Sequence, residues 1–167
     1  MLLFAIEKHQ NRDNHFNSTG AKMYPEILIT PMREELKRAG AKELRTAPEV
    51  DAALADKSGT ALVVVNSVCG CAAGKMRPGV RMALQSSARP DRVYAVFAGQ
   101  DREATERARE LFGAYPPSSP SVALFRNGEL VHFVPRSEIE SRTAQEIAQR
   151  LASVFERHCG KPVAAND

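Results

Sequence analysis

The sequence contains no tryptophan and few aromatic residues of any other kind. Only seven Phe and three Tyr occur among 167 residues, too few for a platform of aromatic side chains that stacks on bases or sugars. Charge of one sign is not in strong excess either. The 23 Lys and Arg residues face 20 Asp and Glu residues, which gives a formal net charge of +3. A surplus this small does not indicate a nucleic-acid partner.

Long apolar runs are also missing. No stretch approaches the roughly 20 apolar residues that span a bilayer. The short run Met1–Ile6 has no basic residues before it and leads directly into Glu7 and Lys8, unlike a signal peptide. The sequence therefore predicts a cytoplasmic protein with no membrane partner, in a compartment where thiols stay reduced unless they carry out redox chemistry.

Cysteine is scarce as well, with three residues in the chain. Three cysteines are too few to staple a small scaffold with disulfides, and the odd number leaves at least one thiol outside any pairing. The remaining composition, 43% hydrophobic and 26% charged, is that of one ordinary globular domain. Because residues 10–20 are polar and aperiodic, we expect a flexible extension over residues 1–22, a folded domain over 23–160 and a C-terminal tail over 161–167.

Apolar residues at helical spacing alternate along the chain with short apolar, β-branched runs. Strands are expected over residues 61–65 and 93–97, and the Asn127-Gly128 pair predicts a hairpin between residues 121–125 and 130–134. Helices are expected after Tyr24, at the Thr46–Glu49 capping box, after Cys71, at Asp101 and at the Thr143–Glu146 capping box. This order predicts an α/β sandwich around a mixed sheet.

Two cysteines stand where the first predicted strand gives way to a helix. At a helix N-terminus the backbone N–H groups and the helix dipole stabilise an anion, so the pKa of Cys69 or Cys71 can fall below the usual value of about 8.5. No Asp or Glu occurs from Lys57 to Pro90, whereas Lys75 and Arg77 follow the cysteines closely. Either a thiolate or an anionic thiol substrate bound nearby would explain this charge pattern.

The positions of the three thiols suggest different roles. Cys69, at the end of the strand, is the natural nucleophile, and Cys71 is the nearer resolving thiol. A disulfide that closes so small a loop is strained and readily reduced, which suits a transient state. Cys159 would be an alternative resolving thiol if the last helix ended near the site, and is otherwise a bystander.

Two other hypotheses remain open at this point. The residues Cys69, Cys71, His158 and Cys159 would together offer four ligands to zinc or to an iron–sulfur cluster. Zinc sites, however, usually space paired cysteines two to four residues apart, and adjacent His and Cys ligands are awkward on one ion, so we expect no metal. In the other hypothesis the thiols are idle and the domain is a scaffold for a partner.

Several motifs in fixed order now identify a family resemblance. They are Val64–Gly74, Val96–Asp101, Pro117–Ser121, His132–Arg136 and His158–Cys159. The chain resembles, from about Tyr24 to Cys159, the bacilliredoxins, which are small bacterial thioredoxin-like proteins with a Cys-Gly-Cys active site. The resemblance implies a thioredoxin-like three-layer sandwich, with a mixed central β-sheet and helices on both faces.

The resemblance also implies a site and an activity. Ser119 and Pro120 would form a cis-proline loop that faces the cysteines and, with Gly70, contacts the substrate. The family removes bacillithiol from mixed disulfides on oxidised proteins, so Cys69 would attack and Cys71 would resolve. A general disulfide reductase or isomerase activity is the alternative.

The expected partners follow from the same chemistry. They are S-thiolated proteins, bacillithiol or another low-molecular-weight thiol as co-substrate, and a thiol or reductase that recycles the enzyme. No tightly bound cofactor is expected. Since bacillithiol carries carboxylates, Lys75 and Arg77 are candidate substrate-binding residues. The chain is expected to be a monomer or a weak homodimer.

Overall fold

A computed structural model describes residues 22–160 of the chain. The extension and tail expected from the sequence therefore lie outside the described residues, apart from Lys22. Within them a single mixed sheet runs in the order β1-β3-β2-β4-β5. Its strands are β1 (Lys42–Glu43), β2 (Thr60–Asn66), β3 (Arg92–Phe97), β4 (Ser121–Arg126) and β5 (Glu129–Val134). Strands β1, β3 and β2 are parallel, and β4 is antiparallel to both β2 and β5.

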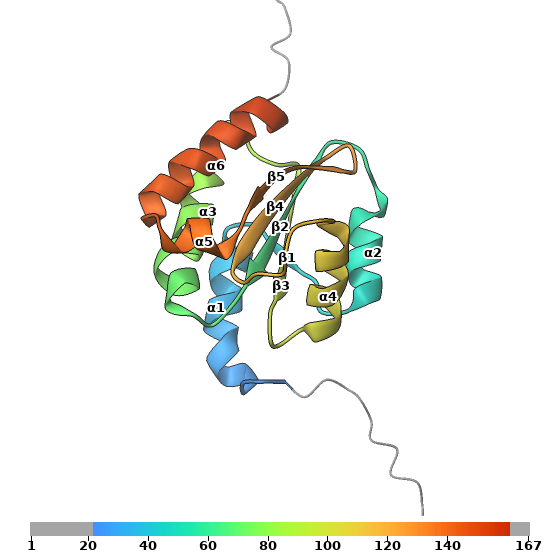
Figure 1. Cartoon of the computed structure of the whole chain (residues 1–167), viewed down its shortest axis with the longest axis vertical. Coiled ribbons are helices and arrows are strands. Elements are labelled where there is room, and N and C mark those ends of the chain that lie inside the picture. The colour runs from blue at the N-terminus through green and yellow to red at the C-terminus, as the bar shows by residue number, and fades with distance from the viewer. Residues whose placement is uncertain (1–21, 161–167) are drawn as a thin grey trace, which may run out of the picture.

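Helices cover both faces of this sheet (Figure 1). One face carries α1 (Glu26–Arg38), α3 (Arg77–Ala83) and α6 (Ala144–Cys159), and the other carries α2 (Ala47–Ala55) and α4 (Arg102–Leu111). The predicted three-layer sandwich is thus confirmed. None of the helices within residues 22–160 is both long and apolar enough to cross a membrane.

The central strand β2 is buried along its whole length. Its side chains alternate between two separate cores: Leu62 and Val64 belong to the α1–α3–α6 side, and Val63 and Val65 to the α2–α4 side. This is why the segment reads as a continuous β-branched run rather than as an alternation of apolar and polar residues.

The predicted helix caps and the predicted hairpin turn are confirmed. Thr46 and Thr143 both form capping boxes with the glutamate three residues on. Asn127 and Gly128 adopt φ angles of 50° and 80°, as the predicted tight hairpin requires.

Two elements and one capping interaction differ from the sequence-based expectation. β1 is two residues long and α5 (Arg136–Glu140) only five, so neither is long enough to show a periodic pattern. Asp101 does precede α4, but its carboxylate makes no capping bond to the helix, because Arg33 engages it instead.

The Arg33–Asp101 ion pair fastens α1 to the turn between β3 and α4. Its two hydrogen bonds are 2.6 and 2.9 Å long, and both side chains are only 4% exposed. The guanidinium also lies 5.2 Å from the ring centroid of Phe97 and bonds Glu26 at 2.7 Å. Since an unpaired buried charge is strongly unfavourable, each partner stabilises the fold mainly by keeping the other satisfied.

Arg33→Met should therefore lower the free energy of unfolding by about 3 kcal/mol, because it leaves the Asp101 carboxylate buried without its partner. The matched change Arg38→Met, at an exposed position of the same helix, should cost less than about 0.5 kcal/mol. Urea denaturation at pH 7 measures both values. Similar losses in the two variants would contradict a specific role for the buried pair.

Candidate active site

The two neighbouring cysteines lie just beyond the carboxyl end of β2. Both are partly exposed and have free thiols. The carbonyl of Cys69 accepts hydrogen bonds from the backbone N–H groups of Ala72 at 3.0 Å and Ala73 at 3.1 Å. These bonds turn the chain directly from the strand into a helix, as the sequence predicts.

That helix begins with an unusual turn. Ala72–Met76 form a π-helical turn, η1, and the α-helix α3 starts only at Arg77. Pro78 therefore falls in the first turn of α3, where its missing N–H removes no intrahelical bond. The change in winding at η1 accommodates Pro78 in the helix that follows.

Cys69 has the more acidic of the two thiols. Partial burial alone would raise its pKa, but hydrogen bonds from Cys71 and Ser67 lower it. The Ser67 hydroxyl oxygen lies 3.2 Å from the sulfur. The backbone N–H of Ala72 and the positive charge of Arg136 act in the same direction. The net result is a pKa below the ordinary cysteine value, which increases the thiolate fraction at neutral pH.

Cys71 is shifted the opposite way. Burial raises its pKa, and so do its hydrogen bond to Cys69 and the negative charge that Cys69 carries as a thiolate. Arg136 lowers the pKa but does not outweigh these effects. When the pair loses its first proton, the negative charge is therefore held on Cys69 and supported by the protonated thiol of Cys71.

A proline loop and a short helix are joined beside the cysteines. The Ser119–Pro120 peptide bond is cis. The backbone N–H of Arg136 donates to the Ser118 hydroxyl at 3.3 Å, and its guanidinium donates to the Ser119 carbonyl at 3.1 Å and to Glu140 at 2.6 Å.

Arg136 is a site residue that the sequence analysis did not single out, although it ends one of the quoted motifs. Its position follows from topology. β5 points in the same direction as β2, because both are antiparallel to β4. Arg136, two residues after β5, consequently lies at the same end of the sheet as the cysteines, beyond the carboxyl ends of β2 and β5. Ligand sites usually lie at this end of such sheets.

Arg77, by contrast, does not face the substrate side. It is buried, and its guanidinium donates to Asn66 Oδ1 at 3.1 Å, to the Ser67 carbonyl at 3.0 Å and to Glu35 at 3.0 Å. The expectation that Arg77 contacts the substrate directly is therefore corrected. Arg77 instead fixes the backbone at the carboxyl end of β2. Lys75 is also engaged within the protein, since its ammonium group donates to the backbone carbonyl of Glu140.

Cys159 lies at the opposite end of the sheet. It hydrogen-bonds Thr60, the first residue of β2, and burial raises its pKa. β2 separates it from Cys69 by about 20 Å at 3.3 Å per residue. Cys159 cannot resolve a mixed disulfide on Cys69 in this arrangement, and no four-ligand site can include all three thiols. Within residues 22–160, no cluster of His, Cys, Asp or Glu side chains could hold a metal ion.

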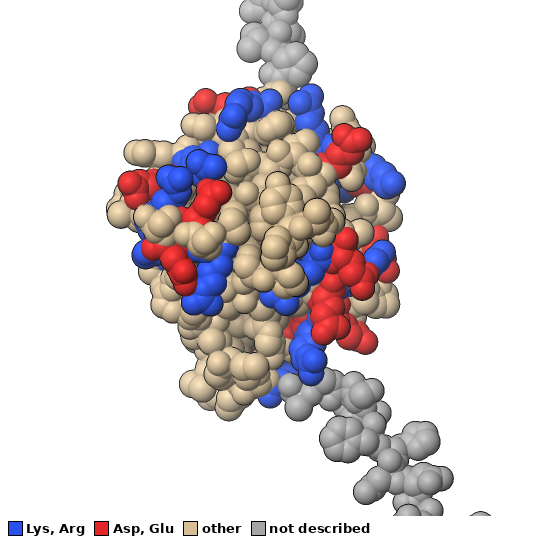
Figure 2. Space-filling view, viewed as in Figure 1, with Lys and Arg blue, Asp and Glu red and all other residues tan. Residues whose placement is uncertain are grey.

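Part of the molecular surface is free of charged side chains (Figure 2). The Met32 carbonyl accepts a hydrogen bond from Asn66 at 3.3 Å, so the first turns of α1 project past the end of β2. There Ile27 and Leu28 are 81% and 58% exposed. These two side chains leave apolar area on the surface at the first turn of α1.

Comparison with known proteins identifies relatives over nearly the whole described region. The model of the family described as disulphide isomerase matches residues 24–159. The chain is 57% identical over 143 residues to a bacilliredoxin of Koribacter versatilis, covering 86% of this chain and 99% of the relative. It is 52% identical over 143 residues to a bacilliredoxin of Bacillus licheniformis, covering 85% and 99%.

Solved structures agree on the fold. A protein described as having a thioredoxin fold superposes with a TM-score of 0.52 at 17% identity, covering 67% of this chain and 94% of that one. A mutant thioredoxin from Halobacterium salinarum NRC-1 gives a TM-score of 0.50 at 17% identity, covering 74% and 95%. At this level of identity the likeness concerns the fold alone.

Arg136→Gln should raise the pKa of Cys69, because it removes the cation that stabilises the thiolate. The measurement is the pH midpoint of iodoacetamide alkylation in a Cys71→Ser, Cys159→Ser background, where only Cys69 reacts. Lys75→Gln removes the same charge from a residue that makes no contact with the thiols and should shift the midpoint less. Equal shifts would show that net charge, and not the position of Arg136, sets the pKa.

Proposed function

This chain belongs to the bacilliredoxin family, and we propose that it is a thiol–disulfide oxidoreductase that removes bacillithiol, or a similar low-molecular-weight thiol, from mixed disulfides on oxidised proteins. The observation that carries the proposal is the unequal Cys69–Cys71 pair. The pKa of Cys69 is lowered, and the pKa of Cys71 beside it is raised. Family membership and fold support the general oxidoreductase activity, and the choice of thiol is the further step.

The first step is an exchange at sulfur. The Cys69 thiolate attacks the bacillithiol sulfur of the mixed disulfide, and a new S–S bond forms as the old one breaks. The sulfur of the target protein leaves as a thiolate and takes a proton from water. The target is thereby reduced, and bacillithiol is carried on Cys69.

The second step depends on how Cys71 responds to the first. Once Cys69 is in a disulfide, its negative charge is gone, and with it the electrostatic effect that raised the pKa of Cys71. The Arg136 charge remains and favours the Cys71 thiolate. Cys71 then attacks Cys69, free bacillithiol leaves, and a Cys69–Cys71 disulfide forms. The charge on one thiol thus sets the order in which both react.

Resetting this disulfide needs two electrons from outside the protein. Two molecules of a low-molecular-weight thiol, or a dithiol reductase, would reduce it, and the donor would leave oxidised. A bystander role for Cys159 is consistent with this scheme, since both sulfurs that exchange belong to the Cys69–Cys71 pair. No tightly bound cofactor is required for either step.

The surroundings of the thiols support an anionic adduct on a protein partner. Arg136 is exposed and lowers the pKa of both cysteines, so it stands within electrostatic reach of carboxylates carried by bacillithiol. Ser119 and Pro120, which Arg136 holds by a hydrogen bond, would contact the substrate together with Gly70. Ile27 and Leu28 offer an apolar surface to the oxidised protein. We place the reaction in the cytoplasm of the cell, with the enzyme a monomer or weak homodimer.

Cys71→Ala protein, mixed with a bacillithiol-modified test protein, should gain the mass of one bacillithiol, mapped to Cys69. The adduct should persist because the resolving thiol is absent, and intact-mass spectrometry detects it. Cys69→Ala should gain no adduct, whereas Cys159→Ala should reduce the test protein as the wild type does.

The same test separates the two activities. If no adduct forms but the wild type still reduces an ordinary protein disulfide, the enzyme is a general reductase or isomerase. An adduct from a cysteine-modified test protein at the same rate would show that the enzyme does not select bacillithiol. Failure of the wild type with every disulfide would contradict the oxidoreductase assignment itself.

The proposed order of the two steps makes a separate prediction. Cys69→Ser removes the negative charge next to Cys71, so the pKa of Cys71 should fall below the higher apparent pKa of the wild-type pair. Thiolate absorbance near 240 nm, followed against pH in a Cys159→Ser background, gives both values. An unchanged or higher Cys71 pKa would mean that the charge on Cys69 does not delay the second step.

A further inference from the structure

A groove of about 600 Å³ lies between β5 and α6. Seven residues line it, and every one of them is polar or charged. Four are basic: His132 on β5, Arg142 in the turn before α6, and Arg150 and Arg157 on α6. The volume is within the range of small-molecule sites, but the lining offers no apolar wall to a hydrophobic ligand.

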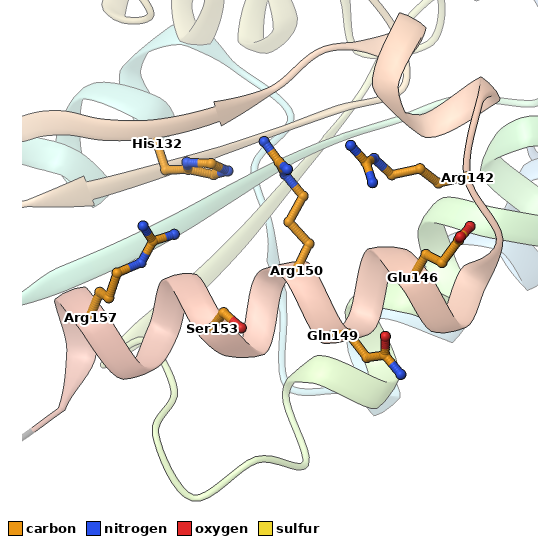
Figure 3. A pocket seen from close by; sticks show the side chains of 7 residues that line it. All are labelled: His132, Arg142, Glu146, Gln149, Arg150, Ser153 and Arg157. Atoms are coloured by element: carbon orange, nitrogen blue, oxygen red, sulfur yellow. The ribbon is translucent and has the colours of Figure 1, made fainter.

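The basic side chains turn toward one another across this groove (Figure 3). The guanidinium groups of Arg150 and Arg157 extend from α6 toward the strand that carries His132, and that of Arg142 extends into the same space from the end of the groove. Arg150 and Arg157 are seven residues apart, so both lie on the flank of α6 that faces β5. Their convergence places several donors around one centre.

Several of these donors lack an acceptor. Among residues 22–160, Nε of Arg142, Nε of Arg150 and Nε2 of His132 are shielded from solvent and have no hydrogen-bond partner. Buried polar groups are normally paired, so three unpaired nitrogens in one groove call for an explanation. An anion with several oxygens, admitted by small movements of the arginine side chains, would supply the missing acceptors.

Two carboxylates at the groove already have partners, and for Glu138 that partner is a groove arginine. Glu138 pairs with Arg150 at 3.2 Å, and the Glu146 carboxylate accepts the Thr143 backbone N–H at 2.7 Å. In the described part of the chain, Arg142 and Arg157 have no ion-pair partner. These two guanidinium groups are therefore available to a ligand.

The pKa of His132 is lowered from its ordinary value. Burial lowers its pKa first, and the charge of Arg150 lowers it further. Arg157 and His158 act in the same direction, and only Glu138 opposes them.

We propose that this groove binds a compact polyanion, a molecule with two or more phosphate or carboxylate groups, through Arg142, Arg150, Arg157 and His132. Planar guanidinium groups pair bidentately with such groups, which favours arginine over lysine in the site. His132 faces Leu124, which in turn faces Leu62 near the start of β2. The His132 end of the groove thus lies toward the start of β2, whereas Cys69 and Cys71 follow the end of β2. The proposal does not depend on the redox function.

Inorganic pyrophosphate without metal is the first probe, with citrate and ATP beside it, titrated calorimetrically into reduced full-length protein in phosphate-free buffer. Pyrophosphate should bind saturably at one site. ATP should bind no more than about threefold more tightly, because the lining has no apolar surface for a base. Citrate should compete for the same site.

The variants test the assignment to these residues. Arg142→Gln with Arg157→Gln breaks no ion pair in the described part of the chain and should weaken pyrophosphate binding by about tenfold. The control pair Arg81→Gln with Arg89→Gln removes the same charge from exposed positions outside the groove and should change affinity less than twofold.

Three results would overturn the proposal. They are no saturable binding by the wild type, an equal loss of affinity in the groove pair and the control pair, or ATP binding at least tenfold tighter than pyrophosphate. Alkylation of Cys69 should stay unchanged in the groove pair, so failure here and failure of the redox proposal are separable.

Discussion

The structure depends on one constraint on the central strand β2. This strand is buried on both faces, yet the residues directly after its carboxyl end must lie at the surface. The apolar residues of β2 need helices on both sides, which fixes the three layers. At the exit, buried polar groups need partners. Arg77 supplies them by bonding Asn66 and the Ser67 carbonyl. The same bonds fix the start of the loop that carries the cysteines.

The reactivity of the site comes from an imbalance between two chemically identical groups. Cys69 and Cys71 are separated by one residue, yet Ser67 and the N–H of Ala72 serve only Cys69. Because the thiols also interact with each other, lowering the pKa of one raises the pKa of the other. Arg136 then favours a thiolate on either sulfur, so it can support both steps of an exchange.

Particular residues show how far sequence reasoning reached. The β-branched run around Val63, the capping boxes at Thr46 and Thr143, and the Asn127-Gly128 turn are local patterns, and each predicted its element correctly. The two-residue strand β1 and the five-residue helix α5 are too short to show a periodic pattern and were missed. Arg136 was missed as a site residue because its nearness to the cysteines is set by the direction of β5, not by spacing in the sequence.

The sequence by itself determined the order of the main elements, the layered α/β fold and the junction that bears Cys69 and Cys71. These follow from burial, capping and helix-terminus electrostatics, which act between near neighbours. Only the tertiary structure decided the roles of residues that meet across the fold. In the folded chain Arg77 is buried, Asp101 pairs with Arg33, and Cys159 lies beside Thr60. These contacts depend on which distant segments the sheet brings together, and short-range sequence patterns do not encode that.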